Sequence, residues 1–406
     1  MEYMVKIKSE SVSGKDLPTI NVGIVGHIDH GKTTLLEKLS GVWASRHSEE
    51  LKRGITIKLG YADVVIYDNN GHFNIEKKGK PVMHVSFVDA PGHEMLMATM
   101  LSGAAMVDAA VLVIAANEGI KPQTREHLMA LQAKNIKNLI VVQNKIDLVN
   151  KEEAKKNYVV IKDFLKGKYD SSPIIPVSAQ QKINLDEIFK AIVNIPIPER
   201  KEDKDPIFIV ARSFDINRPG TKPMDLHGAV LGGTLKQGIL RIGDEIEIKP
   251  GILVKEANQF YYKVLKTKIK NLFKGSKEVK ELNPGGSMSI ETELDMVFGK
   301  ADTLGGNVLS LTDKLPDTTL NLKVRYKLFP EVFGLGGHVK VESIKPSETL
   351  MLSINTSITG GIVKHVKSDV IEMSLKVPVV PFKGENVGLA RNINGHWRLI
   401  GYGEII

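Results

Sequence analysis

Residues 26–34 read Gly-His-Ile-Asp-His-Gly-Lys-Thr-Thr, and the rest of the chain is organised around this stretch. It fits the pattern G-x-x-x-x-G-K-[ST] of a phosphate-binding loop. The two glycines let the backbone curl so that N–H groups point at an anion, while Lys32 adds a cation and the Thr33 hydroxyl can bind Mg²⁺. The apolar run Ile20–Val25 predicts a buried strand before the loop, and a helix is predicted after it. This order distinguishes the stretch from a chance glycine turn.

The bulk composition is that of an ordinary globular protein. The chain has 406 residues, of which 42% are apolar and 25% charged, and this length predicts two or three domains. No apolar run is long enough to span a membrane, and residues 1–15 lack the apolar core of a signal peptide. We therefore expect a cytoplasmic protein without membrane contact. The absence of cysteine excludes disulfides and thiolate metal sites.

The formal net charge of +8 suits a polyanionic partner such as RNA. A lysine-rich solvated surface, common in proteins from hot environments, explains the charge equally well. Charge alone does not choose between these interpretations. The lysines are densest in one region, which holds Lys255, Lys263, Lys266, Lys268, Lys270, Lys274, Lys277 and Lys280.

From residue 19 to about residue 198, apolar runs alternate with helical patterns, which predicts a doubly wound and mostly parallel α/β sheet. The expected strands are Ile20–Val25, Ala62–Tyr67, His84–Val88, Val107–Ala116, Asn138–Val142 and Pro173–Val177. The expected helices are Thr33–Ser40, His93–Gly103, Pro122–Lys134, Lys151–Leu165 and Leu185–Val193. Such sheets bind ligands at the carboxyl ends of their strands, and the polar motifs described below fall there.

A charged and Pro-containing linker at residues 195–206 separates this part from a different pattern. The following stretches are short, β-rich and punctuated by Gly or Pro, as is typical of β-barrels or sandwiches. They include Ile207–Phe214, Gly228–Leu235, Asp244–Lys249 and Val264–Leu272. A second boundary is expected near residues 315–319, which divides the chain into domains at 1–203, 204–318 and 319–406.

The motif at residues 144–147, Asn-Lys-Ile-Asp, predicts which nucleotide is bound. The Asp147 carboxylate can accept hydrogen bonds from the ring N–H and the exocyclic amine of guanine, whereas adenine does not offer this donor pair. Charge-assisted hydrogen bonds contribute about 1.5–3 kcal/mol each, so discrimination should be at least about a hundredfold. Asn144 can tie this loop to the phosphate loop, and the stem of Lys145 can cover a face of the base. Residues 178–180, Ser-Ala-Gln, supply further polar groups nearby.

A second motif, Asp-Ala-Pro-Gly-His at residues 89–93, follows the predicted strand His84–Val88. Asp89 is placed to reach Mg²⁺ through water, and Gly92 can present an N–H group to the γ-phosphate. His93 could orient the attacking water. A capping or packing role for this histidine is the alternative, which the preceding Asp-x-Pro-Gly pattern disfavours.

A third motif, Arg-Gly-Ile-Thr at residues 53–56, lies in the polar connection after the first helix. The Thr56 hydroxyl could join the Mg²⁺ shell only when a γ-phosphate is present, so that the loop orders with triphosphate and relaxes with diphosphate. A plain solvent-exposed loop is the alternative interpretation.

Taken together, these motifs resemble those of the translational GTPases of the elongation factor Tu group. The stretch at residues 47–62, His-Ser-Glu-Glu-Leu-Lys-Arg-Gly-Ile-Thr-Ile-Lys-Leu-Gly-Tyr-Ala, is most similar to the gamma subunit of archaeal and eukaryotic translation initiation factor 2. Gly92-His93-Glu94, Arg-Ser-Phe-Asp at residues 212–215 and the ending His-Trp-Arg-Leu-Ile-Gly at residues 396–401 add to this likeness, which covers nearly the whole chain.

The resemblance implies an α/β P-loop G domain followed by two β-barrel domains. It also implies a GTPase that carries methionylated initiator tRNA to the small ribosomal subunit in its GTP-bound state. The implied partners are an alpha subunit on the first barrel and a beta subunit on the G domain. The implied cofactors are GTP or GDP and Mg²⁺.

Carried onto this sequence, the family's Mg²⁺ ligands are Thr33 and Thr56, and a second Mg²⁺ would be held by Asp29 and the Gly54 carbonyl. Ile28 and Ile55 would screen the catalytic histidine. The residues expected to contact the nucleotide are Asp29, His30, Gly31, Lys32, Thr33, Thr34, Gly92, Asn144, Lys145, Asp147, Ser178, Ala179 and Gln180. The residues expected to act in catalysis are His93, Lys32 and Thr56. The residues expected to bind metal are Thr33, Thr56, Asp29, Gly54 and Asp89.

One region departs from the family pattern. Many archaeal members have a four-cysteine zinc knuckle between the second and third strands, but residues 68–80 of this chain contain no cysteine. His72 alone cannot form a zinc site. We therefore expect a short hairpin there and no zinc.

Three other functions fit parts of this pattern. A selenocysteine-specific elongation factor shares similar switches, but that family usually has a further C-terminal domain, and this sequence ends at Ile406. A nucleotide-binding scaffold without turnover is disfavoured by His93, Thr56 and Asp89. An ATP-using transferase on a similar fold is disfavoured by Asp147.

Overall fold

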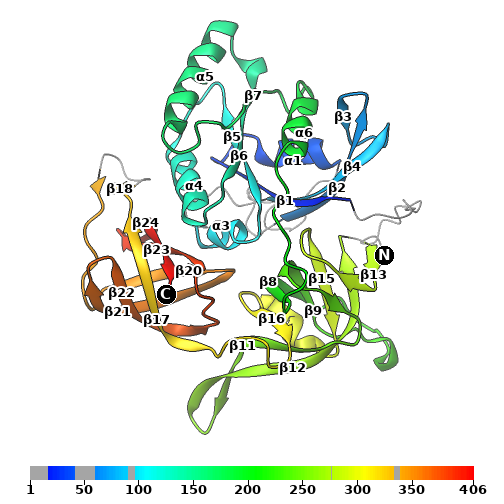
Figure 1. The fold of residues 1–406 in the computed structure, drawn as a ribbon, viewed down its shortest axis with the longest axis vertical. Coiled ribbons are helices and arrows are strands. Elements are labelled where there is room, and N and C mark those ends of the chain that lie inside the picture. The colour runs from blue at the N-terminus through cyan, green and yellow to red at the C-terminus, as the bar shows by residue number, and fades with distance from the viewer. Residues whose placement is uncertain (1–16, 42–59, 90–96, 276, 333–338) are drawn as a thin grey trace.

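The computed structural model describes residues 17–41, 60–89, 97–275, 277–332 and 339–406. These residues form an α/β domain above two β-barrels that lie side by side (Figure 1). The predicted fold class is therefore confirmed. Within the described ranges, no helix is both long and apolar enough to cross a membrane.

The α/β domain is built on a seven-stranded sheet with the order β3-β2-β4-β1-β5-β6-β7. Strands β4, β1, β5, β6 and β7 are parallel, whereas β2 and β3 form an antiparallel edge. Strand β5 reads Ala-Ala-Val-Leu-Val-Ile-Ala and is wholly buried, as the centre of a sheet covered on both faces requires. The strand bounds are β1 Thr19–Gly26, β2 Gly60–Asn69, β3 His72–Asn74, β4 Lys80–Asp89, β5 Ala109–Ala115, β6 Asn138–Asn144 and β7 Ile174–Pro176.

Helices cover both faces of this sheet. Helices α1 and α6 pack their apolar side chains on one face, and the opposite core contains side chains of α3, α4 and α5. Local signals define several ends: Asn150 and Glu153 form a capping box at the start of α5. The helix bounds are α1 Lys32–Ser40, α3 Met97–Ala104, α4 Pro122–Ala133, α5 Lys151–Leu165 and α6 Leu185–Val193.

The region that lacks the zinc-knuckle cysteines forms the expected hairpin. Strands β2 and β3 pair antiparallel, with Asn69 opposite His72. The turn between them is stabilised by Asp68, whose carboxylate accepts a hydrogen bond from the Gly71 N–H at 2.7 Å. The first residues of the predicted helix His93–Gly103 lie outside the described residues, and the described helix α3 begins at Met97.

The first β-domain is a barrel of six strands, closed by pairing between β11 and β12. Along β12 the exposed residues Lys266, Lys268 and Lys270 alternate with more buried residues, so one face of this strand contributes to the core. The barrel strands are β8 Ile207–Phe214, β9 Val230–Gln237, β11 Glu245–Glu256, β12 Gln259–Lys274, β15 Met288–Thr292 and β16 Val308–Leu311. Strand β13 (Lys277–Val279) extends its sheet beyond β12.

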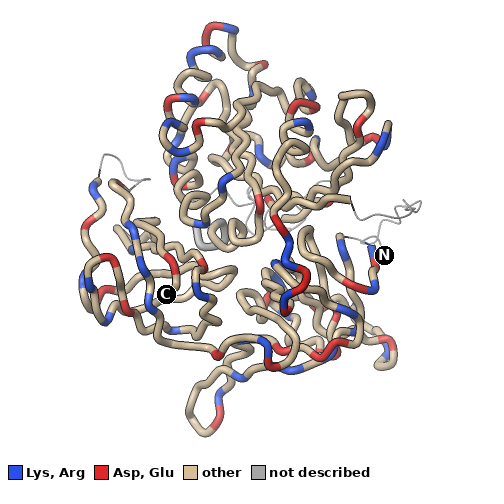
Figure 2. The backbone as a smooth tube through the Cα atoms, in the orientation of Figure 1, with Lys and Arg blue, Asp and Glu red and all other residues tan. Residues whose placement is uncertain are grey.

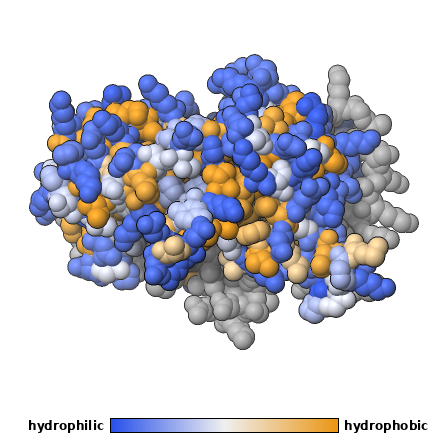
Figure 3. Space-filling model, turned by 90° about the horizontal axis from the view of Figure 1, so that it is seen from below, coloured by the Kyte–Doolittle hydropathy of each residue, from blue (hydrophilic) through white to orange (hydrophobic). Residues whose placement is uncertain are grey.

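The second barrel closes in the order β17-β22-β21-β20-β23-β24. Its strands are β17 Thr319–Leu328, β20 Thr349–Ile354, β21 Ser357–Lys367, β22 Val370–Val379, β23 Asn386–Ile393 and β24 His396–Ile405. A short ribbon of β18 (Glu331–Val332) and β19 (Val339–Lys340) lies at one end. On the face seen from below in Figure 3, hydrophobic residues form small groups between hydrophilic ones.

Part of the lysine cluster at residues 255–280 is neutralised within the first barrel. Along β12, Lys266 pairs with Asp313 at 2.9 Å and Lys268 pairs with Glu245 at 3.2 Å. Lys270 pairs with Glu291 at 3.3 Å. Figure 2 shows blue and red residues interleaved in this part of the chain. These pairings favour the solvated-surface interpretation for this part of the cluster.

The α/β domain contacts the first barrel through a buried amide. The Asn21 side chain donates hydrogen bonds to the Met106 carbonyl at 2.9 Å and to the Thr234 hydroxyl at 3.2 Å. Its oxygen accepts one from the Gly286 N–H at 2.7 Å. Every polar atom of this side chain is satisfied, which compensates for its burial.

The contact with the second barrel contains a buried ion pair. The Arg398 guanidinium on β24 lies 2.6 Å from the Glu126 carboxylate on α4, and both side chains are at most 5% exposed. The Lys134 ammonium at the end of α4 donates to the Ser353 carbonyl at 3.0 Å. Helix α4 is therefore fixed to the second barrel by two charged side chains.

Replacing Arg398 with methionine should destabilise the protein by about 3–5 kcal/mol, because Glu126 would remain as a buried charge without this partner. Urea denaturation measures the change. The matched control is Lys323→Met, which removes an exposed pair with Glu372 at 2.7 Å and should change the stability far less, because water screens exposed pairs. Equal effects of the two substitutions would contradict this account of the interface.

Candidate functional site

Five parallel strands end at one edge of the sheet, and the predicted motifs lie just after them. The phosphate loop follows β1, Asp89 ends β4, and Asn144 ends β6. Residues 178–180 follow β7. The parallel arrangement therefore brings together segments that are more than a hundred residues apart in the sequence.

Two glycines of the phosphate loop have backbones that other residues rarely adopt. Gly26 has φ 141° and Gly31 has φ 87°. A Cβ atom at Gly26 would lie 2.4 Å from the Val113 carbonyl oxygen, and one at Gly31 would lie 2.5 Å from the amide nitrogen of Asn144. Both the conformation and the close packing require glycine here. Helix α1 begins directly after Gly31, so its amino-terminal N–H groups face the loop.

The Lys32 side chain is buried and points back toward the phosphate loop. Its ammonium group donates a hydrogen bond to the His27 carbonyl at 2.8 Å. Burial lowers the pKa of Lys32 to about 8, and the carboxylates of Asp89 and Asp29 act in the opposite direction. Asp89 and Asp29 therefore lie close enough to this cation to stabilise its charged form.

Asn144 links three loops of the site. Its amide nitrogen donates to the His30 carbonyl at 2.9 Å, and its oxygen accepts from the Ala179 N–H at 3.1 Å. This side chain ties the phosphate loop and the segment after β7 to the end of β6. Residues 178 and 179 are buried, whereas Gln180 is exposed.

Lys145 and Asp147 occupy a tight turn after β6. Lys145 has a left-handed backbone with φ 61°, and its ammonium group lies 3.6 Å from the Glu118 carboxylate. Asp147 follows in a short 3₁₀ helix at Ile146–Leu148 and is exposed. An exposed carboxylate at this edge is available to a ligand, and its assignment to guanine stays a prediction.

Sequence reasoning missed three residues that support the phosphate loop. His127 on α4 accepts a hydrogen bond from the Gly26 N–H at Nδ1, at 2.7 Å. Gln123 accepts from the Ile28 N–H at 3.2 Å. Glu118, after β5, lies 4.0 Å from His30 and binds Lys145. The available signal was their position: polar residues shortly after a strand of a parallel sheet.

Burial keeps the histidines at this site neutral. It lowers the pKa of His127 to about 3, with Lys32 contributing next, and it lowers the pKa of His30 to about 4. A neutral His127 is what its hydrogen bond demands, because a protonated Nδ1 could not accept from Gly26. Near neutral pH, His127 therefore holds the loop as an acceptor.

The described residues at this edge offer oxygen donors that suit Mg²⁺. Thr33 lies in the first turn of α1, and the carboxylates of Asp29 and Asp89 both act on Lys32. Hydroxyl and carboxylate oxygens are the ligands that Mg²⁺ prefers. The other predicted ligands and catalytic residues, Gly54, Thr56, Gly92 and His93, lie outside the described residues, as does Ile55.

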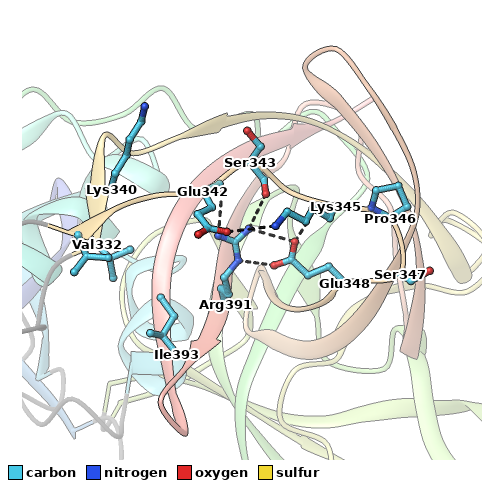
Figure 4. Close-up of a pocket in the computed structure, with 11 residues that line it drawn as sticks. Val332, Lys340, Glu342, Ser343, Lys345, Pro346, Ser347, Glu348, Arg391 and Ile393 are labelled. Carbon is cyan, nitrogen blue, oxygen red and sulfur yellow. Dashed lines mark hydrogen bonds and ion pairs between the residues drawn. The ribbon is translucent and has the colours of Figure 1, made fainter.

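A cavity of about 540 Å³ lies elsewhere, at one end of the second barrel (Figure 4). Its polar groups mainly bind one another: Arg391 pairs with Glu348 at 2.5 Å and donates to the carbonyls of Glu342 and Ser343 at 3.0 and 3.3 Å. None of the predicted site residues lines this cavity, so its size does not make it the functional site.

Comparisons with known proteins agree with the geometry. Residues 17–197 match the family model "Elongation factor Tu GTP binding domain", and residues 320–405 match "Initiation factor eIF2 gamma, C terminal". In structure, a bacterial selenocysteine-specific elongation factor is similar with a TM-score of 0.76 and 22% identity. That match covers 96% of this chain and 58% of the factor. The structure of the elongation factor SelB of Methanococcus maripaludis with the GTP analogue GppNHp is similar with a TM-score of 0.73 and 24% identity. That match covers 97% of this chain and 80% of SelB.

Relatives in sequence are more informative, because at such low identity a structural likeness shows the fold alone. The translation initiation factor 2 subunit gamma of Aeropyrum pernix is 48% identical, over 96% of this chain and 99% of that protein. The same subunit of Archaeoglobus fulgidus is 47% identical, over 99% of this chain and 97% of that protein. The chain therefore belongs to the gamma-subunit family of translation initiation factor 2, whose members are GTPases that act in the initiation of translation.

Proposed function

We propose that this GTPase carries methionylated initiator tRNA to the small ribosomal subunit while GTP is bound and releases it after hydrolysis to GDP. The proposal places the chain in a heterotrimer with alpha and beta subunits. The nucleotide-dependent part of this proposal is supported by the Asn144 side chain, which binds the His30 carbonyl of the phosphate loop at 2.9 Å and the Ala179 N–H after β7 at 3.1 Å. The near full-length similarity to initiation factor gamma subunits supports the identity of the cargo.

The residues proposed to bind the nucleotide have distinct tasks. N–H groups of the loop and of the start of α1 would hold the phosphates, and Lys32 would release its bond to the His27 carbonyl to reach the terminal phosphates. Thr33, Asp29 and Asp89 would hold Mg²⁺ together with Thr56 and Gly54. When bound, Mg²⁺ would neutralise charge on the phosphate oxygens.

The proposed reaction is an in-line attack of water on the γ-phosphorus. The water oxygen forms the new P–O bond, the bond to the β-phosphate oxygen breaks, GDP leaves with that electron pair, and the water proton passes to the phosphate product. His93 would orient the water, and Thr56 would order only while the γ-phosphate is present. If no arginine of the chain acts as a finger, turnover should be about 10⁻⁴–10⁻² s⁻¹ until a ribosomal complex assists.

The defining experiment measures retention of methionyl initiator tRNA by the purified chain together with its alpha partner. Affinity should be about 5–150-fold higher with a non-hydrolysable GTP analogue than with GDP, as expected for coupled binding sites. Filter binding with selenocysteine tRNA as competitor provides the control. Equal retention with both nucleotides, or a preference for selenocysteine tRNA, would contradict the proposal.

The substitution Asp147→Asn should move the nucleotide preference from guanosine to xanthosine, because an amide donor complements the extra carbonyl of xanthine. GDP affinity should fall at least about a hundredfold. Calorimetric titration with GDP and with XDP measures both affinities. The control is Asp186→Asn, an exposed carboxylate in the first turn of α6. Unchanged guanine selectivity would remove Asp147 from the base site.

The substitution His93→Ala should lower hydrolysis by about a hundredfold or more and leave GTP affinity unchanged, because His93 is assigned to the attacking water alone. A single-turnover assay with ribosomal complexes gives the rate. His72→Ala, an exposed histidine of the β2–β3 hairpin, serves as control. If assisted turnover persists in His93→Ala, another group positions the water.

A further inference from the structure

A cleft of about 430 Å³ lies between the α/β domain and the second barrel. Its walls come from the α4–β6 connection, the segment before β7, the end of β17 and strand β24. Asn138 begins β6 beside this cleft, whereas Asn144 at the other end of β6 belongs to the nucleotide site. The cleft is therefore at the opposite edge of the sheet, away from the proposed nucleotide site.

Three exposed lysines, one from each of three separate segments, line the cleft: Lys137, Lys168 and Lys327. None of them forms a hydrogen bond or ion pair with a residue of the described ranges, unlike the paired lysines of β12. Burial and then the Arg125 guanidinium lower the pKa of Lys168, while Glu331 opposes this effect. Three lysines and Arg125 thus place positive charge here, and the Glu331 carboxylate offsets part of it.

Aromatic side chains complete the walls. Tyr169 is buried and fixed by its hydroxyl, which donates to the Ile136 carbonyl at 2.8 Å. Phe329 and Tyr402 are half-buried, with ring centroids 5.5 Å apart and planes tilted by 48°. Both rings pack against the core of the α/β domain on one side, so their remaining surface faces the cleft in a fixed position.

We propose that this cleft binds a single-stranded segment of RNA, with the lysines on its phosphates and the Phe329–Tyr402 pair against a base. Ammonium groups act as point charges for phosphate oxygens, and positive grooves with aromatic faces are the usual way of binding single strands. Lysine is depleted in protein–protein interfaces, which disfavours an acidic protein segment. Such an RNA would bridge the two domains that Glu126 and Arg398 already join.

The test uses the full chain with saturating GDP, which occupies the phosphate loop, and a 3′-fluorescein oligouridylate of about ten nucleotides with a 5′-hydroxyl. Fluorescence anisotropy at several salt concentrations gives the salt dependence of the association constant. Each phosphate contact on a single strand contributes about 0.7 to the magnitude of this log–log slope. In a triple variant with Lys137, Lys168 and Lys327 changed to Gln, the magnitude of the slope should therefore be smaller by about 2. Between 50 and 200 mM salt, the unchanged chain should then lose about 16-fold more affinity than the variant.

The matched control changes Lys364, Lys367 and Lys376 to Gln, which removes the same charge from exposed positions of β21 and β22 in the same barrel. Its slope should stay near that of the unchanged chain, as should that of a triple variant with Arg in the cleft. Unaltered GDP affinity shows that each variant is folded. Equal slopes for the cleft variant and the unchanged chain, an equal loss in the control, or displacement of RNA by polyglutamate or by UMP as efficiently as by unlabelled oligouridylate would each overturn the proposal.

Discussion

The parallel alignment of β4, β1, β5, β6 and β7 is the constraint on which the rest of the structure depends. Because these strands run in one direction, their carboxyl ends meet at one edge, and each loop there can carry polar groups without interrupting the core. The Asn144 side chain, at the end of β6, fixes the positions of two of these loops relative to each other, because it binds both the phosphate loop after β1 and the segment after β7.

Helix α4 connects this edge to the second barrel. Adjacent residues on the helix serve the two sides: Glu126 pairs with Arg398 of β24, and His127 accepts from the N–H of Gly26 in the phosphate loop. Gln123, one turn earlier, binds the N–H of Ile28. Helix α4 therefore contacts backbone groups of the phosphate loop and a side chain of the second barrel at the same time.

The lysines of the chain differ in whether they form ion pairs. Part of the lysine-rich region of the first barrel is neutralised by Glu245 and Glu291 on neighbouring strands and by Asp313 after β16, so the net charge of +8 is not gathered there as unpaired lysines. In contrast, Lys137, Lys168 and Lys327 meet at the boundary between two domains without ion pairs among the described residues. Counting lysines along the chain would not distinguish the paired lysines of the first barrel from these three.

Much of the fold could be predicted because its signals are local. The helices expected at Lys151–Leu165 and Leu185–Val193 have those bounds in the structure, and a capping box within four residues marks the start of the first. The strand expected at Val107–Ala116 is described as Ala109–Ala115. The spacing of the phosphate loop and the Asn-Lys-Ile-Asp motif likewise depends on a few adjacent residues, which a reader of the sequence can recognise.

The sequence by itself thus determined the class of the fold, the order of its elements and the motifs for a guanine nucleotide, since hydrophobic periodicity and short spacings are properties of neighbouring residues. Only the tertiary structure decided that His127 and Gln123 hold the phosphate loop, that Arg398 meets Glu126, and which lysines are paired. These contacts join residues separated by 101, 95 and 272 positions. Such contacts depend on how whole domains pack against one another, so no short sequence pattern predicts them.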